Sequence, residues 1–386
     1  RRRSLKRPVE VMIVFGTRPE AIKLCPLVLA LSERPEDFRT TVCVTGQHRE
    51  MLDQVLDVFD VEPEEDLDVM TEGQSLDGLT ARALARTSEA LDRHQPDWVI
   101  VQGDTTTSFV AALAAFYKKI PVAHVEAGLR THQRYSPFPE EMNRRLISSI
   151  AHLHFAATPR ARDNLVAEGI RDSDVFTTGN TVIDALLWVR ARIREENRRF
   201  PELEGIDFTK RIVLVTGHRR ENFGGGITGI CEALKRVADR NPSVEIVYPV
   251  HRNPNVVAPV HRVLGDVPNV KLLPPLPYQA FIQLMDRSYC IVTDSGGIQE
   301  EAPSLNKPLL VTRESTERQE GVDAGTAVLV GTDASRIEAE LDSLLDDDDR
   351  YASFASASNP YGDGNASRRI VDALLDSSSG KAERPE

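Results

Sequence analysis

Short runs of apolar residues alternate along the whole chain with longer segments whose apolar residues recur at helical spacing. The apolar runs of the first half lie at residues 11–15, 41–44, 98–101, 122–125, 154–157 and 175–177. Those of the second half lie at residues 212–215, 244–250, 270–273, 289–292, 309–311 and 327–330. Strands that alternate with helices predict an α/β fold, in which right-handed crossovers build parallel sheets with helices on both faces.

Two consecutive series of strands predict two doubly wound domains. We expect the first domain to span residues 1–180 and the second to span residues 181–359. A helical stretch rich in Arg and Glu runs to Phe200, and a polar connection follows it up to Arg211, as expected near a domain boundary. The turn-forming residues 359–364 precede one more predicted helix, at 365–375. We expect the segment 360–386 to pack back on the first domain.

Nearly every predicted strand ends in a small cluster of glycine with charged or hydroxyl residues. These clusters lie at 16–20, 46–49, 103–107, 126–128, 179–181, 217–221, 251–252 and 294–297. Ligands bind outside the carboxyl ends of strands in open parallel sheets, where such loops gather. Both predicted domains therefore carry a polar rim, and the sequence predicts an active site in the interdomain cleft.

The segment 289–301 is the best candidate for a phosphate-binding turn. A strand runs into Ser295, Gly296 and Gly297, and a helix with Glu301 in its first turns follows. Glycines let main-chain N–H groups approach an anion, and a helix N-terminus adds partial positive charge. An ordinary strand-to-helix turn with Ser295 as the helix N-cap explains the same residues equally well.

Residues 224–229 match the letters of the GxGxxG dinucleotide motif but not its setting. The preceding strand is expected to stop at Gly217, whereas the motif requires its glycines in the strand-to-helix turn itself. The sequence therefore favours a flexible loop here, and it predicts neither NAD nor any other cofactor.

Composition narrows the class of protein further. The formal net charge of −12 argues against a nucleic-acid-binding protein, and the acidic run Asp346 to Asp349 is interpreted as solvated surface. No apolar stretch is long enough for a membrane span, and the four cysteines form no CxxC pair. These features predict a cytoplasmic protein without membrane association.

Familiar metal and hydrolase signatures are also missing. The histidines form no HExxH motif, no GxSxG elbow exists, and no metal site is predicted. His124 lies inside an apolar strand and is interpreted as a hydrogen-bonded core histidine rather than a metal ligand.

Ten motifs in fixed order resemble the non-hydrolysing UDP-N-acetylglucosamine (UDP-GlcNAc) 2-epimerases. They are FGTRPEAIK (15–23), TGQHREML (45–52), QGDTTT (102–107), HVEAGLRT (124–131), PFPEEMNR (137–144), GNTVIDAL (179–186), TGHRREN (216–222), YPVHRNPN (248–255), TDSGGIQEEAP (293–303) and NPYGDG (359–364). Because they span nearly the whole chain, the resemblance is specific for this family.

The resemblance implies two Rossmann-like domains arranged as in the GT-B glycosyltransferases, a homodimer, and an isomerase of polysaccharide biosynthesis. It further implies that UDP-GlcNAc and UDP-N-acetylmannosamine (UDP-ManNAc) interconvert by elimination of UDP to 2-acetamidoglucal and re-addition, without a cofactor. A GT-B glycosyltransferase and a hydrolysing 2-epimerase that use the same UDP-sugar stay open as alternatives. So do a non-catalytic nucleotide-sugar sensor and an epimerase for a diacetamido sugar.

The resemblance also implies roles for individual residues. The acid–base candidates are Asp104, Glu126, Glu140 and His218. The candidate substrate contacts are Arg18, Lys23, Phe281, Ser295, Gly296, Gly297, Glu301 and Arg318. Gln47, Arg219 and His251 match parts of an allosteric UDP-GlcNAc site that some bacterial members have.

Three positions depart from the family pattern. Leu276 and Gln319 stand where other members have Gln and Pro, and Gly73 stands where some have an Arg of the allosteric site. The last difference leaves allosteric activation open.

Overall fold

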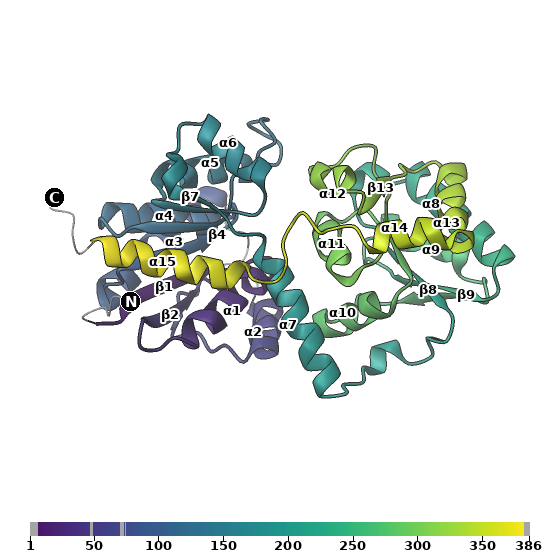
Figure 1. Ribbon diagram of the computed structural model, residues 1–386, viewed down its shortest axis with the longest axis horizontal. Helices are drawn as coiled ribbons and strands as arrows, with labels where there is room; N and C mark the ends of the chain where they lie inside the picture. The colour runs from purple at the N-terminus through teal and green to yellow at the C-terminus, as the bar shows by residue number, and fades with distance from the viewer. Residues whose placement is uncertain (1–6, 47–48, 70–72, 74, 382–386) are drawn as a thin grey trace. The chain divides into compact units, whose positions relative to one another are not determined.

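The computed structural model describes residues 7–46, 49–69, 73 and 75–381. The chain divides into two compact units. The first comprises Arg1–Ala185 with Tyr361–Glu386, and the second comprises Leu186–Pro360. Each unit is built on one parallel sheet with helices on its faces, so the predicted α/β fold with two doubly wound, Rossmann-like sheets is confirmed (Figure 1).

The sheet of the first unit has the strand order β3-β2-β1-β4-β5-β6-β7. Its strands are β1 (Val9–Phe15), β2 (Phe38–Val44), β3 (Glu65–Asp66), β4 (Trp98–Gln102), β5 (Val122–Ala127), β6 (Leu153–Ala156) and β7 (Val175–Thr177). The chain runs outward from β1 to β3 and then returns to β4 on the other side of β1. The loops after β1 and β4 therefore diverge at a topological switch point, where doubly wound sheets bind ligands.

The helices of the first unit connect these strands and cover the sheet. They are α1 (Arg18–Ser32), α2 (Arg49–Phe59), α3 (Leu76–His94), α4 (Thr106–Tyr117), α5 (Glu140–Ile150) and α6 (Pro159–Ala167). Helix α7 (Thr181–Glu195) contains the boundary between the units, which falls after Ala185. The C-terminal helix α15 (Ala366–Lys381) packs against α1 in the first unit (Figure 1).

Polar contacts fix both ends of α15. Arg34 of α1 pairs with Asp372 at 2.8 Å, and the indole N–H of Trp98 donates to Ser378 Oγ at 3.0 Å. At the helix start, the buried carboxylate of Asp184 accepts hydrogen bonds from the main-chain N–H groups of Ala366 and Ser367. These N–H groups have no partner within the helix, so Asp184 satisfies them.

The second unit repeats the arrangement, with the strand order β10-β9-β8-β11-β12-β13. Its strands are β8 (Arg211–Thr216), β9 (Val244–Pro249), β10 (Val270–Leu273), β11 (Cys290–Thr293), β12 (Leu309–Val311) and β13 (Ala327–Leu329). Its helices are α8 (Gly225–Arg240), α9 (Pro254–Leu264), α10 (Tyr278–Arg287), α11 (Gly296–Glu301), α12 (Gln319–Asp323), α13 (Ala334–Asp346) and α14 (Asp348–Ala355). The switch point here lies between β8 and β11.

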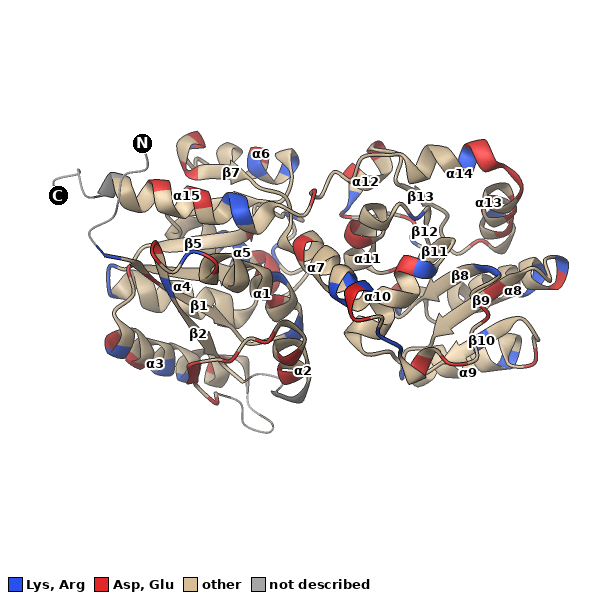
Figure 2. Ribbon diagram, turned by 60° about the horizontal axis from the view of Figure 1, so that its bottom comes forward, with Lys and Arg blue, Asp and Glu red and all other residues tan. Residues whose placement is uncertain are grey.

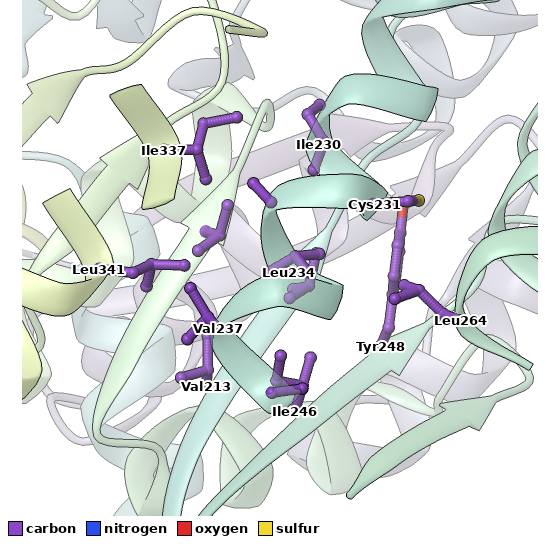
Figure 3. Packing of buried hydrophobic residues seen from close by; sticks show 14 of the residues in the cluster. Val213, Ile230, Cys231, Leu234, Val237, Ile246, Tyr248, Leu264, Ile337 and Leu341 are labelled. Atoms are coloured by element: carbon purple, nitrogen blue, oxygen red, sulfur yellow. The ribbon is translucent and has the colours of Figure 1, made fainter. Parts of the chain in front are cut away.

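Helix α8 shows how the core of the second unit forms. Its apolar residues recur every three or four positions, which places Ile230, Leu234 and Val237 on one face. That face packs on Val213 of β8 and on Ile337 of α13 (Figure 3). None of the helices in the described ranges has the length and apolar character that a bilayer span requires.

The expectation of a flexible loop at residues 224–229 is wrong. These glycines form the start of α8, with Gly224 at φ +78° before the first helical residue. A Cβ on Gly229 would lie 2.7 Å from the main-chain oxygen of Thr332. The glycines therefore allow α8 to pack directly on another loop, a tertiary demand that the local sequence does not reveal.

Strand β3 is the one strand of the described residues that the apolar pattern misses. It consists of Glu65 and Asp66, which pair through their backbones with Cys43 and Val44 of β2. Two charged residues on an edge strand carry no hydrophobic signal.

The acidic run between α13 and α14 is solvent-exposed, as predicted (Figure 2). It also has a local role, because the side chain of Asp347 accepts a hydrogen bond from Arg350 N and caps α14.

Replacing Gly128, which follows β5, should destabilise the first unit strongly. A Cβ there would lie 2.1 Å from the main-chain oxygen of Ala161. We expect Gly128→Ala to lower the free energy of unfolding by at least about 2 kcal/mol, because backbone cannot move aside cheaply. Gly169→Ala is the matched control, since Gly169 has the same φ of +92° and no atom within 4 Å of the added Cβ. Urea unfolding measures both variants, and equal losses would contradict the steric explanation.

Candidate active site

Glu126 lies at the carboxyl end of β5 and is 8% exposed. Its carboxylate accepts hydrogen bonds from Lys23 Nζ at 2.7 and 2.6 Å, from Asn180 Nδ2 at 3.0 Å and from the amide of Gln102. Glu126 adopts φ +60°, a left-handed conformation that is costly for a residue with a side chain. Three donors from three elements hold this carboxylate in place, and Lys23 supplies the opposite charge.

Asp104, in the loop after β4, is the second predicted carboxylate of this region. Arg144 of α5 donates to its Oδ2 at 2.6 Å, and the amide of Asn143 donates to its main-chain oxygen at 2.9 Å. Burial raises the pKa of Asp104 above its ordinary value, and the neighbouring Glu126 raises it further, while Arg144 and Lys23 act in the opposite direction. The structure thus brings Asp104, Glu126 and Lys23 together.

Helix α5 carries both Glu140 and the residues that hold Asp104. Glu140 is its first residue, one turn before Arg144, and is partly exposed. The adjacent Glu141 is fully buried and accepts hydrogen bonds from the main-chain N–H groups of Thr131 and His132. Of these two glutamates, Glu141 therefore has a structural function, and Glu140 stays the predicted acid–base candidate.

Glu20 connects the two loops at the switch point of the first unit. Its Oε2 accepts hydrogen bonds from Gly16 N at 3.1 Å and from the N and Oγ1 of Thr17 at 2.8 and 2.7 Å. Its Oε1 accepts from the hydroxyls of Thr105 and Ser108 at 2.6 and 2.8 Å. The loop that carries the partly buried Arg18 is thereby joined to the loop that carries Asp104.

His218 follows β8 in the second unit, and its side chain is 45% exposed. Its ring lies 3.3 Å, Nδ1 to Oδ1, from the buried Asp294 at the end of β11. The ring also stacks on His251, with the centroids 5.7 Å apart and the planes inclined by 26°. Arg219 contributes its main-chain N–H, which donates to Asp294 Oδ2 at 2.8 Å.

Hydrogen bonds determine the ionisation of Asp294. Burial alone would raise the pKa of this carboxyl, but the imidazole of His218 beside it and hydrogen bonds from the main chain of Arg219 and His218 outweigh burial. The pKa of Asp294 is therefore below its ordinary value.

The candidate phosphate turn lies directly beyond Asp294. Ser295 occupies the N-cap position of α11, but its hydroxyl makes no capping hydrogen bond in this structure. Arg318 approaches the turn closely, since a Cβ on Gly296 would lie 3.2 Å from its guanidinium carbon. Arg318 Nε donates to Glu300 Oε1 at 2.9 Å, which fixes the cation beside Gly296. Glu301 is buried in the same helix.

The remaining predicted residues are less constrained. Phe281 is partly buried in α10, the helix that connects β10 to β11. Gln47 lies outside the described residues. The acid–base candidates Asp104, Glu126 and Glu140 belong to the first unit and His218 to the second, and the cleft that they were expected to share stays a prediction. Within the described ranges, no group of three or more His, Cys, Asp or Glu side chains is arranged to hold a metal ion.

The family model described as UDP-N-acetylglucosamine 2-epimerase matches residues 30–375. The UDP-N-acetylglucosamine 2-epimerase of Salmonella typhimurium is 54% identical over 370 residues, which cover 95% of this chain and 98% of that protein. The chain belongs to the UDP-N-acetylglucosamine 2-epimerase family. The resemblance drawn from the motifs is thereby confirmed, and so is the predicted enzyme class, an isomerase.

Solved structures agree with this assignment. The crystal structure of the UDP-GlcNAc 2-epimerase from Neisseria meningitidis, bound to UDP-GlcNAc, has a TM-score of 0.86 at 46% identity and covers 95% of this chain and 100% of that chain. The glycosyltransferase SnogD from Streptomyces nogalater has a TM-score of 0.60 at 16% identity and covers 96% of this chain and 100% of that chain. The second likeness shows the GT-B-like fold alone.

Several site residues were missed in the sequence because their partners are distant. Glu20 had a local signal, since Thr17 followed three positions later by Glu20 forms a capping box at the start of α1. Asp294 was visible in the glycine-rich turn, but nothing indicated that His218 would lie against it. Asn180 was visible in the polar cluster at 179–181, but nothing indicated that it would contact Glu126, and Arg144 had no signal apart from the family motifs.

His124 is a core histidine, as predicted. It is fully buried in β5, and its Nε2 lies 2.7 Å from the main-chain oxygen of Gly103, next to Asp104. Burial lowers the pKa of His124 to about 3. The contact requires a proton on Nε2, and because burial disfavours the imidazolium, His124 makes it as the neutral Nε2–H tautomer.

Acidification should therefore destabilise the fold through His124. Between its ordinary pKa of 6.5 and about 3, the unfolded chain binds a proton that the folded chain excludes, so stability falls as the pH falls. Between pH 7 and pH 5, we expect the free energy of unfolding to fall by about 2 kcal/mol less in His124→Gln than in the wild type. The glutamine keeps an N–H donor for Gly103 but takes up no proton. Denaturant unfolding at both pH values measures the difference. His261→Gln, at an exposed position of α9, should behave like wild type, and an unchanged pH dependence in His124→Gln would count against this assignment.

Proposed function

We propose that this chain catalyses the reversible epimerisation of UDP-GlcNAc to UDP-ManNAc at C2, without hydrolysis. Family membership supports the reaction, and one relative was solved with UDP-GlcNAc bound. The observation that carries the proposed chemistry is that two carboxylates, Asp104 and Glu126, lie at the ends of adjacent parallel strands and that Glu126 raises the pKa of Asp104. Two carboxylates in such different surroundings are suited to different steps of proton transfer.

The proposed mechanism follows from the weak acidity of the C2 hydrogen. No carbonyl adjoins C2, so direct proton abstraction would be very slow. The C1–O bond breaks first, and its electron pair leaves with UDP. The cationic centre at C1 acidifies the C2–H bond, a base takes the proton, and the C1=C2 bond of 2-acetamidoglucal forms. Protonation of C2 on the opposite face and return of the UDP oxygen to C1 complete the epimerisation.

We assign the proton transfers to carboxylates of the first unit. Burial raises the pKa of Asp104 above its ordinary value, which is the direction of change that a carboxyl acting as general acid or base requires. Glu126 and Glu140 are the other proposed acid–base groups. Glu126 differs from Asp104 in that the Lys23 cation contacts its carboxylate directly.

Stabilisation of the departing diphosphate is assigned to cations and main-chain dipoles. Arg18, His218 and Arg318, with the turn from Ser295 to Gly297, are the proposed contacts. Lys23, Phe281 and Glu301 complete the proposed substrate-binding set, in which Glu301 accepts hydrogen bonds from the ribose. Gln47, Arg219 and His251 are the proposed contacts of an allosteric effector. Gly73 stands at the position where some members have a further Arg in that site.

Incubating the enzyme with UDP-GlcNAc alone in D2O tests the reaction. We expect deuterium at C2 of both UDP-GlcNAc and UDP-ManNAc, because the abstracted proton exchanges with solvent. Recovery of unlabelled substrate without UDP-ManNAc would favour a GT-B glycosyltransferase that waits for an acceptor. Steady release of UDP and free N-acetylmannosamine would identify a hydrolysing 2-epimerase.

Variants in the same assay test the assigned groups. Asp104→Asn and Glu126→Gln should each lower kcat by on the order of 10² or more, because proton transfer loses its acid or base. Asp172→Asn changes an exposed aspartate that pairs with Arg162 on the surface, and it should keep wild-type activity. Wild-type turnover in Asp104→Asn or Glu126→Gln would remove that residue from the mechanism.

We also propose that the protein is a cytoplasmic homodimer. All four cysteines are free and buried, which suits a reducing compartment. Phe116 and Tyr117, at the end of α4, are 56% and 66% exposed, and an assembly would cover such apolar surface. Light scattering should give twice the chain mass of 42.9 kDa, and a monomer at assay concentration would contradict the dimer.

A further inference from the structure

The two carboxylate oxygens of Asp294 have different surroundings. Oδ2 accepts hydrogen bonds from His218 N at 2.9 Å, from Arg219 N at 2.8 Å and from Asn222 Nδ2 at 3.2 Å. Oδ1 accepts no hydrogen bond from the described residues, and the imidazole of His218 is its ion-pair partner, with Nδ1 at 3.3 Å. Asp294 is 1% exposed, so neither oxygen can rely on water.

This asymmetry restricts where the proton of His218 lies. Main-chain N–H groups are always donors, and the Asn222 amide is oriented by a second hydrogen bond to the oxygen of Thr312 at 3.1 Å. Oδ2 is therefore committed as an acceptor. An ionised Oδ1 can also only accept, so the imidazole must present Nδ1–H to it. Nε2 is then the nitrogen directed away from Asp294.

We propose that Asp294 is a positioning residue that keeps the proton of His218 on Nδ1 and directs Nε2 toward the substrate. The role given to His218 rests on the proposed function. A carboxylate against Nδ1 also stabilises the imidazolium, whose Nε2–H donates to an oxygen of the departing diphosphate. The carboxylate orients the imidazole and balances its charge without exchanging a proton itself, as in other Asp–His pairs.

Neighbouring residues support this arrangement from the other strands. His251 stacks on His218, and its Nδ1 accepts a hydrogen bond from Asn253 N at 3.2 Å, which leaves its own proton on Nε2. Gly217, directly before His218, packs against Tyr248, because a Cβ there would lie 2.9 Å from Tyr248 Oη. The ring of His218 is thus limited from one side by Asp294 and from another by His251.

Asp294→Asn separates positioning from packing, because Asn has nearly the same shape. The amide oxygen must face the three donors that surround Oδ2, so the NH2 group faces His218. Nδ1 then becomes an acceptor, and the proton moves to Nε2. The substitution should thus reverse the tautomer of His218 with little change in the fold.

Nitrogen NMR of 15N-histidine-labelled protein reads the tautomer directly, and loss of a signal in His218→Gln identifies the residue. We expect Nδ1–H in the wild type, alone or with Nε2–H, and Nε2–H alone in Asp294→Asn. Nε2–H alone in the wild type would overturn the proposal, and this result needs no variant to fold.

Kinetics supply the second readout. Asp294→Asn should lower kcat by about tenfold or more, with a smaller effect on KM. Combined with His218→Gln, it should cause no further loss, because Asp294 acts through His218. Losses that multiply in the double variant, or a wild-type kcat in Asp294→Asn, would show that Asp294 does not act in this way.

Asp184→Asn is the matched control, since Asp184 is also buried and accepts two main-chain hydrogen bonds but contacts α15. It should lower the melting temperature while leaving kcat and the His218 spectrum unchanged, and a changed spectrum would contradict the proposal. The spectrum requires no substrate, so the two proposals fail separately. If epimerisation is wrong, no deuterium enters C2 although Nδ1–H is present; if positioning is wrong, deuterium enters although Nδ1–H is absent.

Discussion

A carboxylate that leaves water must find donors for its oxygens, and this constraint shapes both candidate rims. An unpaired buried charge costs several kcal/mol, and the buried carboxylates of Glu20, Glu126 and Asp294 each gather N–H, O–H or cationic groups from more than one element. Glu20 joins the loops after β1 and β4. Asp294 joins the segments that follow β8 and β11. Both residues lie at the point where the strand order of their sheet reverses, and that is where two loops most need a connection.

Donor number explains why similar carboxylates differ in their ionisation. Asp294 receives several hydrogen bonds, two of them from main-chain N–H groups, and they outweigh the effect of burial on its pKa. Asp104 has Arg144 as its main partner and Glu126 as a like-charged neighbour, so burial dominates. The first unit thus holds a carboxyl that protonates more readily than usual, and the second holds one that stays charged. The difference follows from the loops that surround each group rather than from the residue type.

Local pattern was sufficient for the fold but insufficient for the contacts of the site. The apolar runs located the strands to within a few residues, because strands buried on both faces leave a continuous hydrophobic signal. The same signal cannot reveal β3, whose Glu65 and Asp66 pair only through their backbones. It also misread residues 224–229, where close packing against Thr332 rather than local flexibility requires glycine. Positions such as Asp104 and His218 could be named from motifs, yet their partners Arg144 and Asp294 lie 40 and 76 positions away in the sequence.

An acidic chain that is proposed to bind an acidic ligand needs local rather than overall charge complementarity. The net charge of −12 would repel a sugar diphosphate, but salt at about 0.1 M largely screens this repulsion at separations beyond about 10 Å. At contact distance, the individual cations and N–H groups decide the interaction. Arg318 is held beside Gly296 by Glu300, and Lys23 is held beside Glu126, so these cations are ordered before a ligand arrives. Each of them carries a carboxylate as counter-ion, and a bound diphosphate would have to share the cation with that carboxylate. Such sharing weakens ground-state binding but leaves positive charge available when the C1–O bond breaks and charge on the phosphate grows, which is the difference that catalysis requires.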